Sequence, residues 1–103
     1  MLGVGEYKAN IDHVFLNCDI VFKITYKYGS YSFEIKSDEV DFDTDITILT
    51  ATENGNTIYA KAEVSVMPGK VIDIFLSFDD NKCNGYFKVP YVGKIKIKDA
   101  VKL

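Results

Sequence analysis

Between Thr57 and Met67 the chain alternates strictly between an apolar set of residues and a second, mostly polar set over eleven positions. The apolar set is Ile58, Ala60, Ala62, Val64 and Val66, and the second set is Tyr59, Lys61, Glu63, Ser65 and Met67. Successive side chains of a β-strand leave the sheet on opposite sides, so this period of two predicts a strand with one buried face. Asn54-Gly55-Asn56 just before it is a turn signal, which makes this strand the expected second arm of a hairpin.

The same period of two recurs in residues 20–28, 71–79 and 94–103, and turn-forming Gly, Pro, Asn and Asp separate these stretches. No stretch repeats its apolar residues with the period of a helix. Seven or eight short strands in one domain over residues 1–103 favour an all-β fold, an antiparallel β-sandwich with immunoglobulin-like architecture. A small β-barrel is the alternative. The chain has no Trp, so the likeness to immunoglobulins concerns architecture alone.

Gly29-Ser30 predicts a second hairpin, because Gly supplies the positive φ that two-residue turns need. A turn closed at these two residues pairs Tyr28 with Tyr31 and Tyr26 with Phe33. Both pairs place apolar residues on one face, so the pattern and the turn chemistry agree.

The register of the hairpin over residues 45–67 stays open. A two-residue turn aligns Leu49 and Ala51 with the apolar face of the next strand, whereas a three-residue loop aligns Ile46 and Ile48. Apolar residues at both parities predict that part of this strand is covered on both sides.

The charge distribution is uneven. The 12 basic residues are all Lys, the 15 acidic residues outnumber them, and the net charge is −3. Residues 1–81 contain 14 acids and 6 lysines, a balance of −8, whereas residues 82–103 contain 6 lysines and 1 acid, a balance of +5. Arginine is the usual reader of phosphates, and an acidic chain repels a polyanion, so we expect no nucleic-acid partner.

No apolar run approaches the roughly 20 residues that span a bilayer, and the first residues lack the basic start and apolar stretch of a secretory signal. We therefore expect no membrane partner, and an intracellular or virion-associated protein rather than a secreted one.

Residues for nucleophilic catalysis are scarce. His13 is the only histidine, and Cys18 lies five positions away, where the two side chains tend to face opposite sides of a strand. We therefore expect no enzymatic activity and no small-molecule ligand. Cys18 and Cys83 are expected to be reduced thiols in or near the core, although one disulfide between them stays open.

Asp41, Asp43 and Asp45 have the spacing that begins a calcium-binding EF-hand loop. The sixth position is Ile46 where that loop needs Gly, and the twelfth is Thr52 where it needs Glu. A looser calcium site is the alternative to a solvated acidic loop, and no other cofactor is expected.

Four apolar side chains fall on faces that the pattern predicts to be outward: Tyr59, Phe75, Met67 and Val21. Exposed aromatic residues that cluster mark a contact surface, whereas single ones are ordinary. The last strand adds a stripe of lysines, Lys94, Lys96 and Lys98, which protects a strand edge or meets an acidic partner.

Together these features predict a non-catalytic protein-interaction or assembly module with a protein partner or self-association. Small structural or accessory proteins of viruses and phages include single domains of this kind, although no residue here indicates that source. The alternative is a carbohydrate-binding module that stacks tyrosines on sugar rings and stabilises its acidic loop with calcium.

Overall fold

The computed structural model describes residues 2–14, 16–37, 46–65 and 68–103, and within these residues it contains eight strands and no helix. None of the described segments therefore offers a helix that could cross a membrane. The strands are β1 (Gly5–His13), β2 (Leu16–Lys27), β3 (Ser30–Lys36), β4 (Ile46–Asn54), β5 (Thr57–Val64), β6 (Val71–Asp79), β7 (Lys82–Val89) and β8 (Gly93–Lys102).

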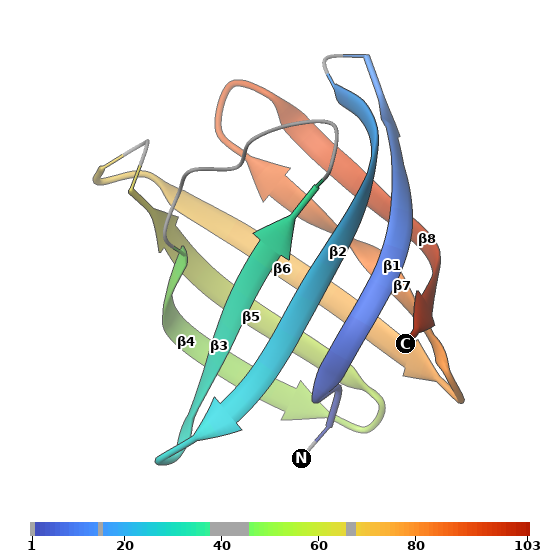
Figure 1. Cartoon of the computed structure of the whole chain (residues 1–103). Helices are drawn as coiled ribbons and strands as arrows, with labels where there is room; N and C mark the ends of the chain where they lie inside the picture. Colours follow the sequence, from blue (N-terminus) through green and yellow to red (C-terminus); the bar gives the residue numbers. More distant parts are fainter. Residues whose placement is uncertain (1, 15, 38–45, 66–67) are drawn as a thin grey trace.

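All eight strands belong to one sheet in the order β3-β2-β1-β8-β7-β6-β5-β4, and every neighbouring pair is antiparallel. The first and last strands pair with each other, and the sheet curls into a nearly closed barrel (Figure 1). The all-β prediction is confirmed, and the barrel alternative is the architecture that fits, since the strands form one sheet and not two. The edges of this sheet are β3 and β4, and the gap between them is called the seam below.

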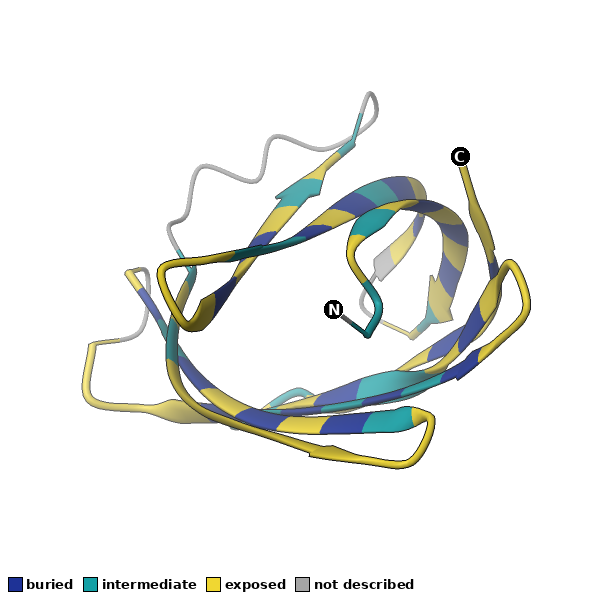
Figure 2. Ribbon diagram, turned by 90° about the horizontal axis from the view of Figure 1, so that it is seen from below, coloured by how far each residue is buried: buried dark blue, intermediate teal, exposed yellow. Residues whose placement is uncertain are grey.

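Buried and more exposed residues alternate along most of the strands (Figure 2), and the buried ones form the core of the barrel. The buried side chains are all apolar among the described residues, and they come from every strand except β4. The largest fully buried ones include Phe22, Ile24 and Leu76. An interior filled in this way is a packed core, as small eight-stranded barrels have.

The hairpin of β2 and β3 has a different register from the predicted one. Lys27 pairs with Ser30 and Tyr26 pairs with Tyr31, so the turn is Tyr28-Gly29 and not Gly29-Ser30. Both turn residues have positive φ, 53° at Tyr28 and 80° at Gly29, which is the conformation of the type I′ turn that matches the twist of a hairpin. The same residues stay on the inner face, because the partner of each residue changes by two positions: Tyr26 pairs with Tyr31 where Phe33 was predicted.

The hairpin of β4 and β5 resolves the open register through a β-bulge. Asn54 pairs with Thr57 across a two-residue turn, and Ala51 faces Ala60, as the two-residue alternative requires. The register then shifts at Leu49, so that Ile48 faces the buried Ala62, as the three-residue alternative requires. The extra residue at the bulge therefore explains why this strand has apolar residues at both parities.

Candidate interaction surfaces

An aromatic row crosses the outer face of three neighbouring strands. Tyr59 on β5 is opposite Phe75 on β6, which is opposite Tyr86 on β7. The rings of Phe75 and Tyr86 are stacked, with centroids 5.6 Å apart and planes at 18°. Aromatic pairs across strands stabilise a sheet, so the row contributes to stability before any role in binding.

Polar side chains contact the two tyrosines at the ends of this row. The Tyr59 hydroxyl donates to a carboxylate oxygen of Asp73 at 3.3 Å, and the Lys94 Nζ lies 4.6 Å from the centroid of the Tyr86 ring. Phe75 approaches Tyr86 from β6 and Lys94 approaches it from β8, the strands on either side of β7. The Tyr86 ring therefore already has a partner from each side, a stacked ring and a cation.

The structure brings together four of the residues predicted to form a contact patch: Tyr59, Phe75, Lys94 and Lys96. Lys96 is directly opposite Tyr86, and Lys98 lies two residues further along β8. Tyr86 was not among the predicted contact residues, although its position next to the apolar Phe87 is the signal that could have placed it on the outer face of a strand.

Val21 does not belong to this patch. It lies on β2, which three strands separate from β6, and it pairs with Lys8 and Lys36. It lines a hollow of about 560 Å³, and Asp19 is among the other residues that line it. Met67 lies outside the described residues, and so do all three acids of the calcium candidate, Asp41, Asp43 and Asp45.

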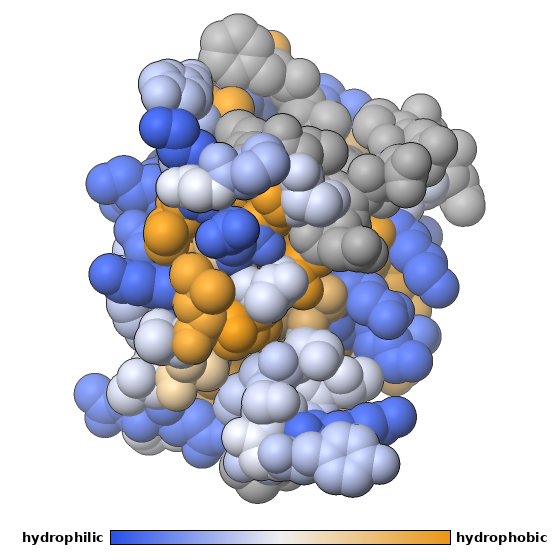
Figure 3. Space-filling view, turned by 90° about the vertical axis from the view of Figure 1, so that its left-hand side faces the viewer, coloured by the Kyte–Doolittle hydropathy of each residue, from blue (hydrophilic) through white to orange (hydrophobic). Residues whose placement is uncertain are grey.

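The seam is the second surface. Among the described strands, β3 has only β2 as a sheet neighbour and β4 has only β5, so one edge of each is unpaired. In β4 only Ile46 and Ile48 are partly buried, and the rest of the strand is exposed. Apolar residues gather on the face shown in Figure 3, which is the left-hand side of Figure 1, where β4 lies. The Leu49 side chain of β4 is 50% exposed.

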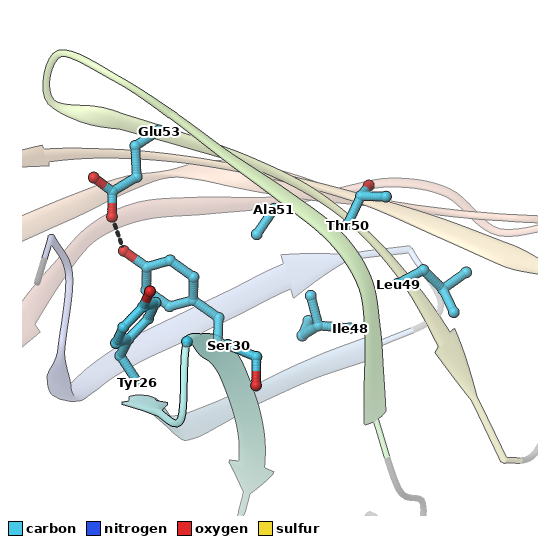
Figure 4. Close-up of a pocket in the computed structure, with 9 residues that line it drawn as sticks. Tyr26, Ser30, Ile48, Leu49, Thr50, Ala51 and Glu53 are labelled. Atoms are coloured by element: carbon cyan, nitrogen blue, oxygen red, sulfur yellow. Dashed lines mark hydrogen bonds between the residues drawn. The ribbon is translucent and has the colours of Figure 1, made fainter.

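A pocket of about 370 Å³ lies at the seam between the two strands. Its β4 wall consists of residues 48–51 and Glu53, and its other wall consists of Tyr26 and residues 29–31. Ile48 and Ala51 point from β4 toward the side of Tyr26, whereas Leu49 points away (Figure 4). The bulge at Leu49 produces this division, because it turns two successive residues to the outer side.

Tyr31 and Glu53 join the two walls of the pocket. The Tyr31 hydroxyl donates its hydrogen to Glu53 Oε1, the bond drawn as a dashed line in Figure 4. The carbonyl oxygen of Leu2 lies 3.2 Å from the same hydroxyl. Tyr31 is only 7% exposed. Burial raises the pKa of Tyr31 well above its usual value, and the hydrogen bond to Glu53 raises this pKa further. The hydroxyl is therefore protonated and a donor at neutral pH.

The two thiols are part of the core. Cys18 and Cys83 are both buried and both free, so they do not form the disulfide that the sequence analysis left open. Burial raises the pKa of Cys83 to about 12, which keeps its thiol protonated and unreactive. Within the described part of the chain, no three His, Cys, Asp or Glu side chains lie together as a metal site would need.

No protein-family model matches this chain, and comparison with curated proteins and with solved structures finds no significant match to either.

Proposed function

We propose that the protein is a non-catalytic protein-interaction module that binds an extended segment of another protein along the seam. The observation that supports this proposal is the edge of β4 that has no strand neighbour among the described residues and that lines the pocket. A partner strand that pairs with such an edge gains main-chain hydrogen bonds and places alternate side chains in nearby pockets.

The composition of β4 also favours an edge that is meant to be paired. Edge strands that must stay unpaired usually contain lysines, prolines or inward charges. Residues 46–52 contain neither a charged residue nor a proline, β-branched Ile and Thr predominate among them, and the one charged residue of β4, Glu53, lies near the end of the strand. On the other side of the seam, β3 has Glu34 and Lys36 near its end. Pairing with a partner is therefore better supported on β4 than on β3.

The carbohydrate alternative has weaker support. Sugar-binding platforms need aromatic rings with a free face, and Tyr86 has Phe75 on one side and Lys94 on the other. Tyr28 and Tyr91 are highly exposed, but each lies in a different turn and they do not belong to the row. The protein-interaction proposal uses the edge of β4, which has no second strand neighbour among the described residues. The carbohydrate alternative would use the Tyr86 ring, which already contacts Phe75 and Lys94.

Selection from a random library of peptides about ten residues long tests the proposal. We expect selected peptides to protect β4 amides from hydrogen exchange, because the added strand covers that edge. Leu49→Lys places a charge on the edge and should weaken binding at least tenfold. Val71→Lys is the matched control, since Val71 is 43% exposed and lies on β6, inside the sheet. A library without binders, or binders that protect only other strands, would overturn the proposal.

A further inference from the structure

We infer that the seam selects an extended segment with a lysine or arginine two positions before a large apolar side chain, and that Glu53 determines this choice. This inference rests on the proposed function, because it concerns the partner that the same surface binds.

The charge of the pocket is the first observation. Glu53 is the one charged side chain among the described residues that line the pocket, and no lysine is among them. Its carboxylate belongs to the inner side of β4, since Glu53 is paired with Ile58, which is fully buried. A negative charge at the rim of a partly apolar pocket favours a cationic side chain and disfavours an acidic one.

The geometry of Glu53 is the second observation. Tyr31 has one hydroxyl hydrogen and donates it to Oε1 of Glu53. This bond holds the carboxylate at the seam, while its other oxygen keeps acceptor sites for a guanidinium or an ammonium group. A charge-assisted hydrogen bond to a carboxylate that is already oriented loses less conformational entropy than one to a freely rotating side chain. Tyr31 is thus a positioning residue for Glu53.

The apolar part of the pocket gives the spacing. Ala51 precedes Glu53 by two residues, and Ile48 lies on the same side of β4 beyond the bulge. All pairs in this sheet are antiparallel, so a strand added to β4 in the same manner runs from Glu53 toward Ala51. Its residue opposite Glu53 comes first, and the residue two positions later, about 7 Å away, faces Ala51 and Ile48. The expected order is therefore cation, any residue, large apolar residue.

Two capped, fluorescently labelled peptides test the inference: Thr-Thr-Arg-Thr-Leu-Thr-Val-Thr and the same peptide with Glu in place of Arg. Fluorescence polarisation should show that the Arg peptide binds the protein at least tenfold more tightly. Glu53→Gln should reduce this preference to less than threefold, and Tyr31→Phe should reduce it in part. Glu6→Gln is the control, because it removes the same charge from an exposed position on β1 and should leave the preference unchanged.

The outcomes separate the inference from the proposed function. If both peptides bind equally and both protect β4 amides, the charge selection is wrong and strand addition stands. If neither peptide binds and the random library also has no binders, both proposals fail. A stable dimer in light scattering that Leu49→Lys converts to monomer would show that a second copy occupies the seam, and this would overturn the selection of a cationic segment.

Discussion

Tyr31 on β3 donates its hydroxyl hydrogen to Glu53 on β4, so a side-chain bond joins the two strands that the main-chain ladder leaves unpaired. Neighbouring strands elsewhere in the sheet are joined by main-chain ladders, which range from two residue pairs between β1 and β8 to nine between β1 and β2. Within the described residues no main-chain ladder joins β3 to β4 at the seam, and under the proposed function this is where a partner strand would pair with β4. The same bond places a carboxylate where an entering strand would meet it.

The Tyr31 hydroxyl predicts how stability depends on alkaline pH. Its pKa in the folded protein is raised above the value of about 10 for an unfolded chain. Above pH 10 the unfolded state loses this proton while the folded state keeps it, so the free energy of unfolding should fall as pH rises. One such group contributes a slope of up to about 1.4 kcal/mol per pH unit. Urea unfolding between pH 7 and pH 11 measures this slope.

The Tyr31→Phe variant checks the assignment. Without the hydroxyl, the alkaline slope should become shallower, and the free energy of unfolding at pH 7 should be about 1 to 2 kcal/mol lower because the hydrogen bond to Glu53 is lost. Tyr7, Tyr59 and Cys83 add to the slope of the intact protein, since burial raises the pKa of each of them as well. A variant that loses stability at high pH as steeply as the parent chain would show that Tyr31 is not responsible.

The sequence predicted the strands well, because alternation is a local property that each stretch displays by itself. It did not predict the bulge at Leu49, which depends on whether Ile48 packs better against Ala62 than Leu49 does. The predicted turn of the hairpin of β2 and β3 was also one residue too late, because a preference for Gly does not say which of the two turn positions Gly takes. In both places a choice between two local solutions is made by packing across the sheet.

The local sequence pattern could predict neither the closure of the sheet nor the seam. Whether eight strands form one sheet or two depends on the pairing of β1 with β8, which are separated by nearly the whole chain. The bond between Tyr31 and Glu53 depends on that closure, so no spacing in the sequence indicated it. By contrast, Tyr59 and Phe75 were predicted to be outward, and the structure adds that they are direct cross-strand neighbours.

We expect a side chain at position 85 to have a large steric effect. A Cβ atom at this position would lie 1.8 Å from the carbonyl oxygen of Phe75, which belongs to the main chain of β6 and has little freedom to move. Gly85→Ala should therefore lower the free energy of unfolding by about 3 kcal/mol or more. Thermal and urea unfolding measure the change.

Gly29→Ala is the comparison for that variant. Gly29 has a φ of 80° and no neighbouring atom within 4 Å of an added Cβ, so the alanine there meets only backbone strain. This strain should cost about 1 to 2 kcal/mol. If Gly85→Ala were no more destabilising than Gly29→Ala, the strands β6 and β7 would not approach each other as closely as the structure has them.

The stacked rings of Phe75 and Tyr86 predict a measurable coupling. In a double-mutant cycle with Phe75→Leu and Tyr86→Leu, the two changes should be non-additive by about 1 kcal/mol, because each single variant already removes the stack. Peptide binding at the seam should be unchanged in all three variants.

If Tyr59→Ser and Phe75→Ser weakened association with a protein partner while leaving the fold intact, the aromatic row would itself be a contact surface.

The two thiols predict a slow, unfolding-dependent reactivity. Cys18 is 2% exposed and Cys83 is not exposed at all, and the thiolate that reacts with disulfide reagents is disfavoured further at Cys83 by its raised pKa. A thiol-specific chromogenic reagent should therefore react with neither cysteine in the folded protein and with two per chain in urea. Tyr28→Cys, at a fully exposed turn, should add one fast-reacting thiol and so prove the reagent active. Fast reaction of the parent chain would mean that the barrel wall beside Cys18 or Cys83 opens readily, whereas no reaction in urea would mean that the two are joined in a disulfide.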